Sequence, residues 1–193
     1  MSPGSLDRAR HHHDAARSAR RPASGGASVV DLDPLTGEPE QLRSAYSCFP
    51  SGVTAVCALS GGRPRGIAAS SFTPVSLNPP LVSVCVQNTS TTWPRLRTLP
   101  RLGVSVLGAG QDTTATRLAA KHGDRFADVP WQATPDGGVL VHQAVLWLDC
   151  SVHSEVSAGD HIVALLQVHG LRSHPDRVPL VFHGSRFRQL VEV

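Results

Sequence analysis

Short apolar runs that end at turn residues recur along this chain, and their spacing limits its fold more than any other feature. At least six such runs are present, and they occupy residues 52–60, 65–72, 81–87, 102–108, 144–156 and 161–171. The pair Gly61-Gly62 lies between the first two runs and predicts a hairpin turn. Strands that are joined mostly by hairpins, with few crossover helices, favour an antiparallel barrel over a doubly wound parallel sheet.

Three segments have the features of short helices. We expect one helix over residues 42–49, one that begins near Thr89 or Ser90, and one over residues 112–123. Hydroxyl or carboxylate side chains stand at the start of the last two, where they can cap free amide groups. No GxGxxG motif follows a strand and no GxxxxGK[ST] loop is present, so neither standard nucleotide-binding fold is supported.

The first forty residues differ in composition from the rest of the chain. Residues 1–40 are rich in Arg, Ala, Ser, Gly, Pro and His, show no period of a strand or helix, and are predicted to form a disordered extension. Residues 41–193 are then a single domain. Three consecutive histidines, His11 to His13, lie in this extension, where a metal ion would find no fixed geometry. We therefore predict no metal site.

Composition excludes several classes of protein. The formal net charge is only +3 and aromatic residues make up 5% of the chain, so a nucleic-acid-binding surface is not expected. No stretch reaches the roughly twenty apolar residues of a membrane span, and no hydrophobic secretion signal follows the early arginines. The four cysteines occur singly in or beside apolar runs, which predicts reduced core thiols. A cytoplasmic protein with no membrane or nucleic-acid partner is expected.

Two clusters of hydroxyl side chains flank the run 81–87. Their eight members fall within 23 residues and are Ser70, Ser71, Thr73, Ser76, Thr89, Ser90, Thr91 and Thr92. Hydroxyls beside the free amides of a helix N-terminus can bind a phosphate without a lysine. Ser and Thr also cap and turn the backbone in any fold, so their spacing leaves both readings open. A titratable residue, His161, follows the turn Gly159-Asp160 between the last two apolar runs.

The order of several short motifs resembles the flavin reductase-like proteins, which bind FMN in a split barrel. The matching blocks are FPSGVT at 49–54, GxxxSSFxxVSLxPPLV at 66–82, SxT at 90–92, DRFA at 124–127, GDH at 159–161 and PLVF at 179–182. The blocks keep the family's order over residues 42 to 190. The resemblance implies a mainly β, antiparallel split β-barrel with Greek-key connections, about six strands and a few short flanking helices. It also implies a homodimer.

The resemblance implies a function for particular residues as well. Members transfer a hydride from NADH or NADPH to FMN or FAD and commonly supply reduced flavin to a partner monooxygenase. The positions expected to bind the flavin cofactor are Pro64, Arg65, Gly66, Ile67, Ala68, Ser70, Ser71, Cys85, Val86, Gln87, Thr91, Thr92, Arg125 and Phe126. The positions expected at the nicotinamide are His161, Phe182, His183 and Gly184. His161 is the expected catalytic residue, because it can orient the nicotinamide or carry a proton.

Two features leave alternatives open. The segment Phe182–Phe187 lacks the tyrosine hydroxyls common in the family and carries one extra residue, so nicotinamide binding is expected to differ. A flavin-binding module without efficient reductase activity, or an FMN-dependent oxidoreductase acting on its own organic substrate, therefore remains an alternative. Neither the choice between FMN and FAD nor that between NADH and NADPH can be read from the sequence. Arg95 and Arg97 are equally consistent with a flavin phosphate contact and with solvated surface charge.

Overall fold

The computed structural model describes residues 29–191, of which residues 36–191 belong to one compact unit. Three helices are present in the described range: α1 (Pro39–Tyr46), α2 (Trp93–Leu96) and α3 (Asp112–Ala119). The strands are β1 (Ser51–Gly52), β2 (Thr54–Ser60), β3 (Arg63–Ala69), β4 (Thr73–Leu77), β5 (Pro80–Gln87), β6 (Leu102–Val106), β7 (Trp131–Ala133), β8 (Val139–Val141), β9 (Leu146–Ala158), β10 (His161–Ser173), β11 (Leu180–His183) and β12 (Arg186–Gln189).

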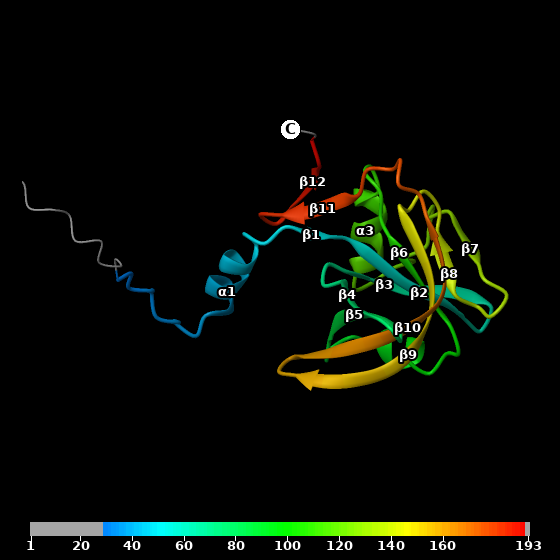
Figure 1. Ribbon diagram of the computed structural model, residues 1–193, viewed down its shortest axis with the longest axis horizontal. Helices are drawn as coiled ribbons and strands as arrows, with labels where there is room; N and C mark the ends of the chain where they lie inside the picture. The colour runs from blue at the N-terminus through cyan, green and yellow to red at the C-terminus, as the bar shows by residue number, and fades with distance from the viewer. Residues whose placement is uncertain (1–28, 192–193) are drawn as a thin grey trace, which may run out of the picture. The chain divides into compact units, whose positions relative to one another are not determined.

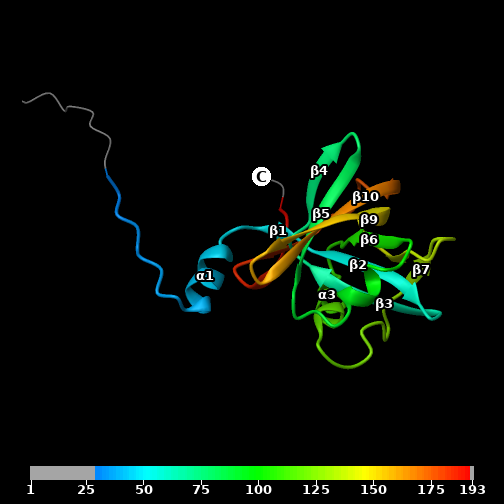
Figure 2. The same cartoon turned by 90° about the horizontal axis from the view of Figure 1, so that it is seen from below.

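Seven of these strands form one antiparallel sheet with the order β3-β2-β6-β9-β10-β5-β4 (Figures 1 and 2). All six strands expected from the apolar runs lie in this sheet, which confirms the mainly β, antiparallel prediction. The seventh strand, β4, was not among the expected strands, and its sequence TPVSL contains Pro74. It lies at the sheet edge, the place where a strand tolerates a residue without an N–H group. Two smaller sheets, β1-β11-β12 and β7-β8, complete the fold.

Two tight turns place strands that are needed for the site. Gly61 and Gly62 both have positive φ angles, 60° and 73°, and join β2 to β3 as the sequence predicts. Gly159, with φ 64°, starts the turn between the thirteen-residue strands β9 and β10. Glycine at the first central position is typical of a type II′ hairpin turn. His161 therefore stands at the first position of β10.

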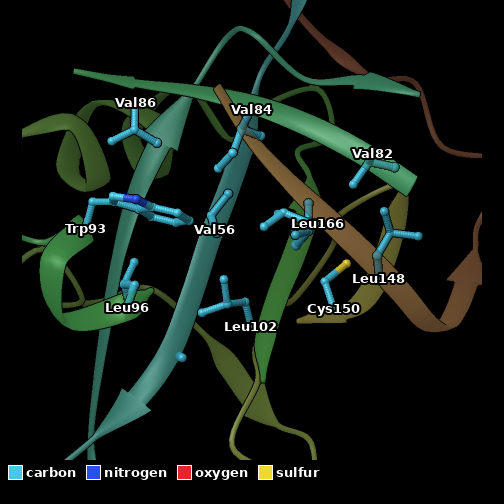
Figure 3. Close-up of a cluster of buried hydrophobic side chains, with 13 residues drawn as sticks. Val56, Val82, Val84, Val86, Trp93, Leu96, Leu102, Leu148, Cys150 and Leu166 are labelled. Carbon is cyan, nitrogen blue, oxygen red and sulfur yellow. The ribbon is translucent and has the colours of Figure 1, made fainter. Parts of the chain in front are cut away.

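One apolar cluster fills the inside of the large sheet (Figure 3), and a second packs the opposite face of β2 against α3. The side chains of β2, β5, β6, β9 and β10 alternate between the first cluster and the opposite face, so that Val82, Val84 and Val86 point inward from β5. Figure 3 shows Trp93 beside Val86 at one end of the cluster. The indole N–H of Trp93 donates to Glu155 at 2.6 Å, so this buried polar group is satisfied.

The helix boundaries differ from those expected. The first helix spans 39–46 rather than 42–49, and none of its residues is buried. The second begins at Trp93, because the Ser90 hydroxyl accepts the Trp93 N–H at 3.1 Å and the hydroxyl-rich residues before it are not helical. The third ends at Ala119, since Ala120 is already extended.

The cysteines were expected to be core thiols, and this is wrong for Cys48 and for Cys85, which is only half-buried and lies outside the buried core. Cys48 follows α1, is exposed, and is a free thiol like Cys57, Cys85 and Cys150. Cys57 and Cys150 are buried. Burial is the main cause that raises the pKa of both thiols, to about 12 for Cys150, so both stay protonated at neutral pH.

Several expectations concern features outside the described residues. His11 to His13 and most of the predicted extension, residues 1–40, fall there, although α1 already begins at Pro39. No helix between residues 29 and 191 is long and apolar enough to cross a membrane. Within that same range, no group of three His, Cys, Asp or Glu residues could hold a metal ion.

Candidate functional site

Two neighbouring cavities contain almost every residue expected to bind a cofactor. The first has a volume of about 590 Å³ and is called the hydroxyl cavity here, because Ser70, Ser71, Thr89, Ser90 and Thr91 line it. The second has a volume of about 780 Å³ and is called the arginine cavity, because Arg63, Arg65, Arg95 and Arg125 line it. Thr91 and Arg125 belong to both, so the two cavities share a wall.

The predicted flavin-binding residues divide between these cavities. Those in the hydroxyl cavity are Ile67, Ala68, Ser70, Ser71, Cys85, Val86, Gln87, Thr91 and Arg125. Those in the arginine cavity are Pro64, Arg65, Gly66, Thr91, Thr92, Arg125 and Phe126. Segments that lie about sixty residues apart in the sequence therefore surround one continuous region.

An edge strand forms one side of the hydroxyl cavity. β3 pairs only with β2 in the large sheet, so its other edge presents unpaired backbone groups. The Gly66 carbonyl accepts a hydrogen bond from Arg125 on that edge, at 3.0 Å. Backbone groups two residues apart on a strand point the same way, so Ala68 also turns its N–H and C=O outward. A planar ring with several heteroatoms needs donors and acceptors of this kind.

The opposite side of the hydroxyl cavity is made by paired strands. His161 is the register partner of Gln87, which places the first residue of β10 beside the last residue of β5. The His161 ring nitrogen Nδ1 lies 2.7 Å from Asp160 Oδ1. An ionised carboxylate only accepts, so Nδ1 carries the proton and Nε2 of the neutral ring is left as an acceptor. The hydrogen bond from His161, and next its positive charge when protonated, lower the pKa of Asp160.

Arg125 is held at the wall between the cavities. Its Nη1 donates to the Gly66 carbonyl at 3.0 Å and to the Thr92 hydroxyl at 2.9 Å. These two bonds use one nitrogen of a group that has five N–H donors, so others remain for an anion. Thr92 thus contributes by fixing Arg125.

Three predicted residues have structural tasks in addition to lining a cavity. The Ser71 hydroxyl accepts the Cys85 N–H at 2.8 Å and donates to the Cys85 carbonyl at 3.2 Å, which fastens the link between β3 and β4 to β5. The Val86 side chain is buried in the core, so only its backbone is available to a ligand. Gly66 is required by packing, because a Cβ there would lie 2.3 Å from Cys57 Sγ.

The other predicted nicotinamide residues do not line either cavity in this chain. Phe182 and His183 lie in β11, which pairs with β1 and β12, and Gly184 makes the turn to β12. The rings of Phe182 and Phe187 pack edge to face with centroids 5.4 Å apart. Their role at the nicotinamide stays a prediction.

The sequence reasoning missed part of both cavities. The segment after α3 brings Lys121 and His122 to the hydroxyl cavity, and Arg63 and Trp131 line the arginine cavity. Lys121 and His122 lie in an irregular segment after α3, within the range that was expected to be helical, and Trp131 stands four residues after the recognised block DRFA but outside it. Arg63 stands between the Gly61-Gly62 turn and the predicted strand 65–72, and the structure extends β3 back to include it.

The residues present fit a flavin. The hydroxyl cavity falls in the range of roughly 300–1,000 Å³ that is typical of small-molecule sites. The free edge of β3 supplies hydrogen-bonding groups for a ring, and Thr91 with Arg125 offers hydroxyl and guanidinium donors for a phosphate at its far end. The four-residue α2 is too short to provide a strong helix dipole, so the Arg125 guanidinium is a stronger donor for an anion there than the helix terminus that the sequence suggested.

Comparison with known proteins agrees with this geometry. Residues 46–191 match the model of the flavin reductase like domain. An NADH-dependent FAD reductase of Streptomyces globisporus is 41% identical over 155 residues, which cover 77% of this chain and 84% of the relative. The reductase subunit HsaB of a flavin-dependent monooxygenase from Rhodococcus jostii is 32% identical over 150 residues, which cover 78% of this chain and 77% of the relative.

A solved structure shows the same similarity in three dimensions. The NADH:FAD oxidoreductase of Streptomyces globisporus C-1027, in complex with NAD and FAD fragments, superposes with a TM-score of 0.76 at 39% sequence identity. The match covers 86% of this chain and 98% of that one. With the family model spanning most of the sequence, the chain belongs to the flavin reductase-like family.

Proposed function

We propose that this chain is an NAD(P)H-dependent flavin reductase that acts on FMN or FAD. The observation that carries the proposal is the hydroxyl cavity, in which the edge of β3, the Thr91–Arg125 wall and His161 surround one site. The similarity to an NADH-dependent FAD reductase supports both the flavin and the nicotinamide.

The flavin, when bound, supplies the redox chemistry by accepting a hydride from the nicotinamide. The chain's own residues have to position the two rings and exclude water. The outward backbone groups of Ala68 would hydrogen-bond the ring, while Thr91 and Arg125 would hold the phosphate. His161, fixed by Asp160, would direct Nε2 into the cavity, where it orients the nicotinamide or accepts a proton.

Assembly as a homodimer is part of the proposal. Large apolar side chains are exposed in the single chain: Phe49 is 75% exposed, Leu77 97% and Val156 55%. A second copy would remove this surface from water, at a gain of about 25 cal/mol per Å² of apolar area. Sedimentation of the purified protein should give twice the mass of the 20.5 kDa chain, and a monomer at micromolar concentration would contradict this part.

We also propose that reduced flavin leaves the site and serves a partner monooxygenase in the cytoplasm. The relative from Rhodococcus jostii is named as a reductase subunit of such a monooxygenase. The four free thiols suit a reducing compartment. Oxidised product should form when a flavin-dependent monooxygenase is separated from the reductase by a dialysis membrane that passes flavin, and no product would count against release.

The direct test mixes purified protein with NADH or NADPH and with FMN or FAD, and follows nicotinamide absorbance. Loss of absorbance that depends on protein and flavin is expected. The control is His161→Asn, which should keep flavin binding while nicotinamide oxidation slows. Tight flavin binding without oxidation under any pairing would instead identify a flavin-binding module. Oxidation that requires a further organic substrate, with flavin retained, would identify an oxidoreductase with its own substrate.

A further inference from the structure

The hydroxyl cavity is lined by cations without a neighbouring carboxylate. Lys121 and Arg125 line it together with two histidines, and none of its lining residues in the described part of the chain is an aspartate or a glutamate. Asp124 and Asp160, the acidic residues closest to them in the sequence, lie outside this lining. An anion in the cavity therefore meets positive charge that no carboxylate offsets.

Lys121 differs from the other cations of the chain. Of the 18 lysine and arginine residues, it is the one lysine. It makes no hydrogen bond or ion pair with any of residues 29–191, whereas Arg125 is bound to Gly66 and Thr92. A lysine ammonium is a compact charge on a flexible stem, while the planar guanidinium suits the paired oxygens of a phosphate. Lys121 is thus a free cation that suits a single negatively charged edge better than a phosphate.

The position of Lys121 is at the ring end of the proposed flavin site. The proposed phosphate contacts, Thr91 and Arg125, stand in the wall shared with the arginine cavity, whereas Lys121 lines only the hydroxyl cavity. Lys121 follows the last turn of α3, where Leu118 is buried in the apolar cluster against which Ala68 packs. Ala68 is the proposed contact of the ring, so the end of α3 brings the lysine to the side of the cavity that the ring would occupy.

Hydride transfer changes the charge of the ring but not that of the phosphate. The hydride leaves the nicotinamide C4 with both electrons of the broken C–H bond and forms a bond to the flavin N5. The neutral oxidised ring becomes an anion, and the nicotinamide becomes a cation. A cation beside the ring therefore interacts more strongly with reduced than with oxidised flavin. A cation at the phosphate makes no such distinction.

We propose that the Lys121 ammonium contacts the flavin ring and makes this chain bind reduced flavin more tightly than oxidised flavin. This rests on the proposed function, because it takes the hydroxyl cavity as the ring site. It goes beyond that function by assigning to one residue the balance between holding and releasing the product. Reduced flavin should leave more slowly than oxidised flavin, since affinity differences within one site arise mostly in dissociation rates.

Equilibrium binding of the two oxidation states tests the proposal without turnover. FMN and FAD are titrated in oxidised form and, after reduction by dithionite in the absence of oxygen, in reduced form, and binding is followed by the quenching of tryptophan fluorescence. The unaltered protein should bind reduced flavin about tenfold or more tightly, which raises the midpoint potential of bound flavin by about 30 mV for each factor of ten. Lys121→Gln should remove this difference by weakening reduced flavin, with the affinity for oxidised flavin within about twofold of the original.

Two further variants separate a contact at the ring from general charge effects. Lys121→Arg keeps the positive charge and should retain most of the preference for reduced flavin. Arg172→Gln removes one positive charge from a residue that lines a separate hollow beside Trp147. Both flavin affinities should stay unchanged in Arg172→Gln, although the net charge falls as it does in Lys121→Gln.

The single lysine also allows a test by chemical modification. Acetylation of amines removes their charge, whereas reductive methylation keeps it, and Lys121 is the one side-chain amine of the chain. Acetylated protein should lose the preference for reduced flavin, and methylated protein should keep it. Lys121→Gln treated in the same way reports the effect of the α-amino group, which should be absent. Bound flavin should slow the acetylation of Lys121, as measured by mass spectrometry.

Three results would overturn the proposal. Equal affinity for the two oxidation states in the unaltered protein would show that no cation acts on the ring. An equal loss of both affinities in Lys121→Gln would assign the lysine to attraction of the phosphate. Unchanged affinities in that variant would leave Lys121 as a solvated residue after α3. If binding behaves as expected and no nicotinamide is oxidised, the role of Lys121 stands and the proposed reductase activity fails.

Discussion

Replacement of Gly66 by alanine tests whether this residue serves the packing of the sheet. Its position was expected at the flavin, yet a Cβ there would lie 2.3 Å from Cys57 Sγ and 3.1 Å from both Cys57 Cβ and the Val56 carbonyl oxygen. Ordinary contact begins at 3.4 Å, so the sulfur would have to move by about 1 Å within a fully buried region. Only the sulfur would lie closer than 3.0 Å, and a substitution of Cys57 can remove it.

The expected energies follow from this geometry. Gly66→Ala should lower the free energy of unfolding by about 1–3 kcal/mol, the usual cost of overpacking. Cys57→Ala alone should cost about 0.5–3 kcal/mol because it leaves a small cavity. The double variant should cost clearly less than the two singles together, by about 1 kcal/mol or more, because the new methyl group occupies the space of the lost sulfur.

Urea unfolding followed by tryptophan fluorescence measures these differences. Gly52→Ala is the matched control, since nothing lies within 4 Å of a Cβ at that position and its φ is not positive. It should change stability by no more than about 0.5 kcal/mol. Additive costs of Gly66→Ala and Cys57→Ala would refute the packing argument and return Gly66 to the ligand side of β3.

Three further predictions concern the site. Arg125→Ala should raise the dissociation constant of FMN by about tenfold or more, since one charge-assisted contact contributes about 1.5–3 kcal/mol; an unchanged constant in fluorescence titration would remove Arg125 from the phosphate. Bound flavin should protect Cys85 from alkylation by iodoacetamide, as measured by mass spectrometry. Exposed Cys48 should react at its original rate, and buried Cys57 and Cys150 should stay unlabelled. Alkylation of Cys85 at an unchanged rate would place the ring elsewhere. His161 lowers the pKa of Asp160, so the stability from this pair should be fully present above the pKa that the carboxyl has in the unfolded chain and should be lost as pH falls through its lower pKa in the folded protein. The melting temperatures of the wild type and Asp160→Asn should therefore converge at acid pH. A difference that stays constant with pH would contradict this prediction.

The strands of the large sheet could be predicted because local chemistry determines them. Gly61-Gly62 and Gly159-Asp160 supply the φ angles that tight hairpins need, and the apolar runs on either side have strand length. β4 was not predicted. A strand tolerates a proline such as Pro74 only where it has one partner, and whether a strand lies at the edge is a property of the whole sheet. The start of α2 depends on which hydroxyl accepts the Trp93 N–H, and the four neighbouring hydroxyls at residues 89–92 leave that choice open.

The site was predictable as a set of residues and much less as an arrangement. The recognised motifs named residues that do surround two adjacent cavities. How these residues are arranged around the two cavities depends on contacts between residues far apart in the sequence, such as Arg125 with Gly66 or Ser71 with Cys85. No local pattern reveals such contacts, and none reveals that Lys121, His122 and Trp131 complete the walls.

The hydroxyl cavity has one wall made of paired strands and one made of an irregular segment. β10 is paired on both sides, with β5 and β9, so His161 cannot shift unless the sheet moves with it. Lys121 and His122 follow the end of α3 and have no such support. Surface loops open at lower free energy than paired strands. The rates at which flavin enters and leaves should therefore depend on the sequence of residues 119–125, and alteration of that segment should change residence time before it changes the alignment of the reacting rings.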